Sequence, residues 1–84
     1  MNCPMLSGSQ IRAARSLLAI SSRDLAAMSG VGWATIRRFE IADGVPEGRP
    51  ATLERIRTTL EAAGIEFLGD PATSPGVRLT RPAG

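Results

Sequence analysis

Residues 21–40 read SSRDLAAMSGVGWATIRRFE, which is two short helical patterns separated by a glycine-containing break. Ser21 can cap the first helix, because Asp24 follows three residues later at the capping-box position. The pattern predicts a two-turn helix over Ser22–Met28. Its inward-facing residues are expected to be Leu25 and Met28.

The break at 29–32, SGVG, permits a tight turn, because glycine adopts backbone conformations that other residues avoid. A second helix is expected over Trp33–Ala42, with Ile36 and Phe39 as its buried pair. Pro46 prevents this helix from resuming after Asp-Gly. Two short helices joined by a turn that contains glycine define a helix–turn–helix motif.

Another helix is expected on each side of this motif. The first runs from Ser9 to Ile20, and its apolar stripe comprises Ile11, Ala14, Leu17 and Leu18. The last begins at Pro50, which suits the first helical position, and ends before Gly64. Its stripe comprises Leu53, Ile56, Leu60 and Ala63. Residues 1–7 lack periodicity and are expected to form a loose tail.

After Gly64 the pattern changes from helical to extended. Ile65–Leu68 and Val77–Thr80 are expected to be strands, joined by a loop over Gly69–Gly76. Two strands alone are marginally stable, so they either pack on the last helix or pair across a dimer. The predicted fold is mainly α: a tail over 1–8, a four-helix domain over 9–64 and a two-stranded β arm over 65–84.

Composition excludes several classes of protein. With 84 residues the chain is one small domain, and it buries only roughly 60–65% of its unfolded surface. One cysteine and no histidine exclude a disulfide framework and a multi-cysteine zinc finger. We expect no catalytic residues, no metal and no cofactor, and we expect Cys3 to be inert. No spanning segment or secretory signal is recognisable, so a cytoplasmic location is the default expectation.

Charge is unevenly distributed along the chain. Residues 1–39 carry five arginines against Asp24 alone, whereas residues 40–84 carry five arginines against seven carboxylates. A basic N-terminal half on a chain of net charge +2 indicates either a surface for a polyanion or a solvated charged face.

The segments SSRDLAAMSGV (21–31) and ATIRRFE (34–40) resemble the Cro/repressor type of helix–turn–helix. This type is also called the xenobiotic-response-element family of small bacterial or phage transcriptional regulators. The resemblance covers about residues 9–60. It implies sequence-specific binding of double-stranded DNA, with a recognition helix at about Trp33–Ala42 in the major groove.

The resemblance also implies a structural ion pair. Thr35-Ile36 followed by Glu40 matches the family's Thr-Ile…Glu pattern, and the family's glutamate pairs with an arginine of the first helix, here Arg15. Independently, Arg15 lies near the apolar stripe of its helix, where a lone arginine needs a partner. We therefore expect a partly buried Arg15–Glu40 pair that ties the recognition helix to the first helix.

The same resemblance assigns DNA contacts. Base contacts are expected from Trp33, Ala34, Arg37 and Arg38, and backbone contacts from Ser22, Arg23 and Thr35. Arg37 or Arg38 contacts either a guanine edge or a phosphate. Trp33 departs from the family, which usually has a polar residue there, and it either contacts DNA or is buried in the core or against a partner. Gly32 replaces the family's usual Ser or Thr cap.

A homodimer is expected, because one recognition helix reads only a few base pairs. The residues expected at the dimer contact are Ile65, Phe67, Val77 and Leu79. The alternative is a hairpin that covers its own core, and Arg78 and Arg81 on this arm can instead contact phosphates.

The rival functional hypothesis is a protein-interaction module, such as an antitoxin or a phage adaptor, that uses the same fold to bind a partner protein. An enzyme is disfavoured, because the sequence offers no nucleophile–base pair.

Overall fold

The computed structural model describes residues 6–42, 44–46, 48–71 and 73–80. Its elements are α1 (Gly8–Leu18), α2 (Ser22–Ser29), α3 (Trp33–Ile41), α4 (Pro50–Ala62), β1 (Ile65–Leu68) and β2 (Gly76–Leu79). The expected fold class, four helices followed by a two-stranded β arm, is confirmed. Each helix and strand begins and ends within two residues of its expected limits.

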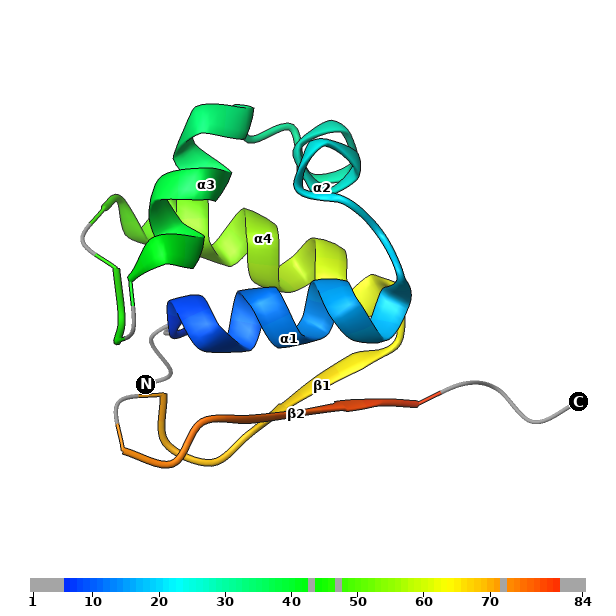
Figure 1. Cartoon of the computed structure of the whole chain (residues 1–84), viewed down its shortest axis with the longest axis vertical. Coiled ribbons are helices and arrows are strands. Elements are labelled where there is room, and N and C mark those ends of the chain that lie inside the picture. The colour runs from blue at the N-terminus through cyan, green and yellow to red at the C-terminus, as the bar shows by residue number, and fades with distance from the viewer. Residues whose placement is uncertain (1–5, 43, 47, 72, 81–84) are drawn as a thin grey trace, which may run out of the picture.

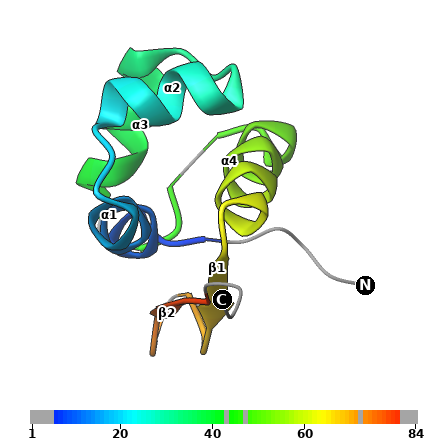
Figure 2. The ribbon, with the colours of Figure 1, turned by 90° about the vertical axis from the view of Figure 1, so that its right-hand side faces the viewer.

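The elements lie in three tiers (Figures 1 and 2). Helices α1 and α4 form the middle tier, α2 and α3 lie on one side of it, and the β hairpin lies on the opposite side. The longest helix, α4, has 13 residues. Within the described ranges, no helix is both long and apolar enough to cross a bilayer.

Local sequence explains the ends of the two capped helices. At α2 the Ser21 hydroxyl accepts from the Asp24 N–H, and the Asp24 carboxylate accepts from the Ser21 N–H, so the expected capping box is present. The pKa of the Asp24 carboxyl group is lowered, first by the hydrogen bond from the Ser21 N–H and then by a hydrogen bond between the carboxylate and the Ser21 side chain. A second capping box, which was not anticipated, joins Ser7 to Gln10 at α1.

The core sits between the helices and the hairpin. Its buried apolar residues are Leu6, Ile11, Ala14, Leu25, Val31, Ile36, Phe39, Leu53, Ile56, Leu60 and Ile65. The expectation that Met28 faces inward is wrong, because Leu25 and Ala26 form the buried face of α2 and leave Met28 exposed. Leu17 is also exposed, since it lies at the edge of the α1 stripe, away from its centre.

The residues before α1 differ from the expected loose tail. Leu6 and Ser7 are completely buried. Gly8 is also buried, and its N–H donates to the Gly44 carbonyl at 3.0 Å. Residues 1–5, including Cys3, lie outside the described ranges. The entry into α1 is therefore part of the packed domain.

The hairpin pairs within the chain. Strands β1 and β2 are antiparallel, with Ile65 opposite Leu79 and Phe67 opposite Val77. Ile65 is buried, and the other three side chains pack against the core of their own chain. The four side chains thus contact the core of their own chain, as in the alternative of a hairpin that covers its own core, and the dimer contact through them stays a prediction.

Gln10 joins the hairpin to α1. Its side chain is 2% exposed, and its amide nitrogen donates to the carbonyls of Leu68 at 3.3 Å and Gly76 at 3.0 Å. Leu68 and Gly76 face each other at the loop end of the ladder. The Gln10 amide therefore bonds to both strands of the hairpin and attaches the hairpin to α1.

We predict that Gln10→Ala lowers the free energy of unfolding by about 1–2 kcal/mol, because two carbonyls lose their donor and the capping box is broken. The measurement is a thermal melt followed by circular dichroism, with a drop of roughly 5–15 °C. Ser16→Ala, at an exposed position of the same helix, is the control. Equal melting temperatures for the two variants would contradict the role given to Gln10.

Candidate nucleic-acid interface

Helices α2 and α3 are joined by a short turn over 30–32, at the positions where the sequence predicts two helices and a glycine-containing break. Gly30 ends α2 at φ 74°, a left-handed conformation that favours glycine, and its N–H donates to the Ala26 carbonyl. Val31 follows and is buried, as is Ile36 on α3. These contacts fix the angle at which α3 leaves the turn.

An ion pair holds α3 against α1, at the residues that the sequence indicates. Arg15 Nε lies 2.9 Å from one Glu40 carboxylate oxygen, and Nη2 lies 3.0 Å from the other. The Arg15 side chain is 26% exposed and that of Glu40 is 8% exposed. Arg15 also donates to the Ile20 carbonyl, and Arg12 to the Glu40 carbonyl. The expectation of a partly buried Arg15–Glu40 pair is confirmed.

The arginines divide into two groups by their partners. In the described ranges Arg15, Arg57 and Arg78 form ion pairs with glutamates, and Arg12 donates to a backbone carbonyl. In the same ranges, five exposed arginines have no carboxylate partner, and all belong to α2, α3, the residue before α4, or α4: Arg23, Arg37, Arg38, Arg49 and Arg55. The uncompensated positive charge therefore lies on the helix–turn–helix unit and on α4.

Sequence reasoning missed Arg49 and Arg55. Both belong to the half of the chain whose net charge is negative, so a count along the sequence hides them. In the structure, Glu61 pairs with Arg57 and Glu66 pairs with Arg78, and neither glutamate compensates these two arginines. The ion pairs, rather than the linear charge, show which arginines have no carboxylate partner in the described ranges.

Trp33, the first residue of α3, contacts both helices of the motif. Its indole Nε1–H donates to the Ser22 hydroxyl at 3.0 Å. The guanidinium carbon of Arg23 lies 4.1 Å from the centroid of the indole ring, and that of Arg37 lies 5.3 Å from it. The residue remains 36% exposed, so Trp33 lies on the surface of this chain and not in its core.

The other expected contact residues differ in exposure. Ala34, Arg37 and Arg38 are exposed on α3, and Arg38 lies over the Phe39 ring at 5.3 Å. Ser22 and Thr35 are only half-buried, so they remain accessible from one side. Gly32 precedes α3 without a side-chain cap, as its residue type implies. The structure thus brings the expected base-contacting side chains to the exposed side of one helix.

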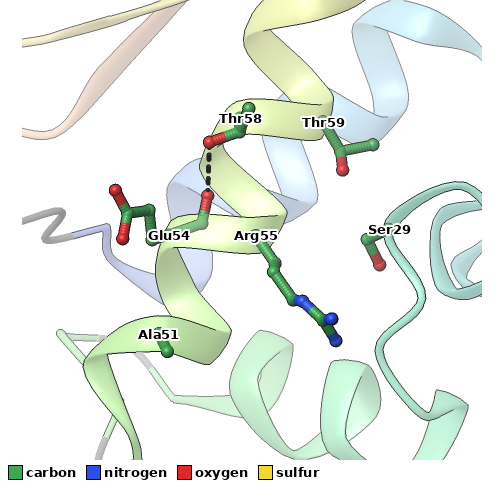
Figure 3. Close-up of a pocket in the computed structure, with 6 residues that line it drawn as sticks. All are labelled: Ser29, Ala51, Glu54, Arg55, Thr58 and Thr59. Atoms are coloured by element: carbon green, nitrogen blue, oxygen red, sulfur yellow. Dashed lines mark hydrogen bonds between the residues drawn. The ribbon is translucent and has the colours of Figure 1, made fainter.

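A shallow groove of about 400 Å³ lies between α4 and the end of α2 (Figure 3). Ser29 and Thr58 line it, but their hydroxyls donate to the backbone carbonyls of Leu25 and Glu54. Arg55 extends across the groove toward the turn, and its Nη1 lies 4.0 Å from the position that a Cβ would take on Gly30. The groove therefore carries part of the positive charge beside the turn.

Comparison with known proteins adds no family to this geometry. No protein-family model and no curated protein matches the chain. Among the side chains that the structure describes, no three of His, Cys, Asp or Glu are grouped so that they could hold a metal ion.

Proposed function

We propose that this protein is a sequence-specific, double-stranded DNA-binding transcriptional regulator that acts as a homodimer and inserts α3 into the major groove. The observation that carries the proposal is the group of five exposed arginines on α2, on α3, just before α4 and on α4 that have no carboxylate partner among the described residues. DNA presents a dense row of phosphates, and arginine is the side chain best suited to bind them.

The positions of these arginines match two different tasks. Arg23 at the start of α2, with the Ser22 hydroxyl beside it, suits a phosphate contact, because a guanidinium group and a hydroxyl are both common donors to phosphate oxygens. Arg37 and Arg38 on the exposed side of α3 suit the groove, where an arginine reads guanine through two hydrogen bonds. The Arg15–Glu40 pair would hold α3 firmly enough to make such reading selective.

The tiers restrict how two copies can bind one DNA duplex. The hairpin lies on the opposite side of α1 from α3 (Figure 1). A dimer joined face to face through its hairpins would direct its two recognition helices in opposite directions. If the two hairpins instead pair along the free edge of a strand, both recognition helices lie on the same side of the joint sheet. Edge strands readily pair with a strand of a second chain. The proposed homodimer is therefore an edge-paired one.

The test of the function is selection of bound sequences from a random duplex library at ~0.15 M salt. We expect an enriched palindrome whose half-sites are ~10 base pairs apart, since each protomer presents one recognition helix. If the folded protein enriches no sequence, the proposal fails, and the same surface would then be sought in a complex with a partner protein.

We predict that Arg37→Ala and Arg38→Ala each weaken binding to the selected site by roughly tenfold, because each removes a base or phosphate contact worth about 1–3 kcal/mol. Both side chains are exposed, so melting temperatures should change by no more than a few degrees. The measurement is fluorescence anisotropy with a labelled duplex.

Arg57→Ala is the matched control for these variants. It removes the same charge, but Arg57 already pairs with Glu61 on α4 and is not among the arginines assigned to DNA. Its affinity should equal that of the parent protein. If Arg37→Ala and Arg38→Ala also bind as tightly as the parent, α3 is not the recognition helix.

A further inference from the structure

The Trp33 ring contacts three side chains of its own chain and remains partly exposed. Guanidinium groups of Arg23 and Arg37 lie over the ring, and its nitrogen edge is hydrogen-bonded to Ser22. The hydrogen bond uses the one donor of the ring, and the two guanidinium groups compete with a base for stacking on it. The rest of the indole ring is carbon, in a residue that is 36% exposed, so an apolar group is the partner that suits it.

We infer that Trp33 reads thymine: the carbon edge of its indole contacts the 5-methyl group of one thymine in each half-site. The inference rests on the proposed function, which places the first turn of α3 at the base edges. Among the groups exposed in the major groove, the thymine methyl is the apolar one. An apolar ring edge at the first position of α3 has no better partner there.

The same contacts make Trp33 a positioning residue for Arg37. The two residues are four apart on α3 and so lie on the same face of the helix. Stacking on the ring restricts the long Arg37 side chain before DNA arrives, which reduces the freedom lost on binding. We therefore expect the half-site to place the thymine beside a guanine that Arg37 reads.

The experiment removes single methyl groups from the DNA. In the selected site, each thymine is replaced in turn by deoxyuridine, which keeps every hydrogen-bonding group and lacks only the 5-methyl. Affinity for each duplex is measured with the parent protein and with Trp33→Ala. For the parent protein, one particular thymine in each half-site should be sensitive to the replacement. Replacing that thymine alone should weaken binding by about fourfold, the loss expected for one buried methyl group.

The variant shows which side chain senses that methyl. Trp33→Ala should bind the thymine and the deoxyuridine duplexes equally, and it should also bind the original site more weakly than the parent does. Ile41→Ala serves as the matched control, because it truncates another exposed apolar side chain, at the other end of α3, and should keep the parent's response to the methyl group. Circular dichroism melts confirm that both variants are folded.

The outcomes separate this inference from the proposed function. A selected site at which no deoxyuridine replacement changes the parent's affinity overturns the thymine contact and leaves DNA binding intact. A methyl effect that persists in Trp33→Ala assigns the contact to another side chain and also overturns it. If no site is selected at all, both proposals fail. Trp33 is the sole tryptophan of the chain, so a change in its fluorescence on binding provides a second readout.

Discussion

Gly8→Ala is expected to lower the free energy of unfolding by about 3 kcal/mol, which corresponds to a melting temperature reduced by roughly 12–24 °C. Gly8 is the first residue of α1, and helix propensity alone would make alanine there favourable. The added Cβ would, however, overlap the carbonyl oxygens of Phe39 and Ala42 at the end of α3. Both obstacles are backbone atoms, so α1 and α3 would have to separate.

Helix propensity predicts that Gly8→Ala stabilises the protein, whereas the overlap with α3 predicts that it destabilises the protein. Gly44→Ala is the control, because a Cβ at Gly44 meets nothing within 4 Å, and we expect it to change stability by no more than about 0.5 kcal/mol. Chemical denaturation of the parent and both variants gives the comparison. A Gly8→Ala protein as stable as the parent would show that α1 does not enter the domain against the end of α3.

Glu40→Ala is expected to cost about 2–3 kcal/mol, or a melting temperature lower by roughly 8–24 °C. The change removes both acceptors of the Arg15 side chain and leaves a largely buried cation with only the Ile20 carbonyl. A fully buried pair would cost more, but Arg15 is 26% exposed and water recovers part of the loss.

An exposed pair in the same protein provides the comparison. Arg57 and Glu61 lie four residues apart on α4, at 33% and 45% exposure, so Glu61→Ala should cost no more than about 0.5 kcal/mol. A double-mutant cycle with Arg15→Ala isolates the coupling between Arg15 and Glu40. If Glu40→Ala and Glu61→Ala cost the same, the pair does not hold α3 to α1.

Local features of the sequence determined most of the secondary structure. Ser21 with Asp24 and Pro50 set where α2 and α4 begin, because capping and proline geometry depend on neighbours a few residues away. Gly30 ends α2 for the same reason. Apolar spacing also identified Leu25, Ile36 and Phe39 as core residues. It failed at Met28, because a two-turn helix has too few residues to define the direction of its buried face.

Contacts between distant residues were decided by the tertiary structure alone. The contact of Gly8 with the end of α3 and the contact of Gln10 with the loop end of the hairpin have no signal in the local sequence, because the partners are more than 30 residues away. The paired strands cover their own core for a related reason: only the assembled helices create the apolar gap that they fill.

In the candidate interface, too, some features follow from the local sequence and others from contacts between distant residues. Residue types at fixed spacings indicated the helix–turn–helix pattern and the arginines of α3, whereas the Arg15–Glu40 pair was implied by the resemblance to the Cro/repressor type. Only the folded chain sorted the arginines into paired and unpaired groups and placed Arg23 and Arg37 over Trp33. Charge and stacking depend on which side chains meet in space, and spacing along one helix cannot specify a partner on another.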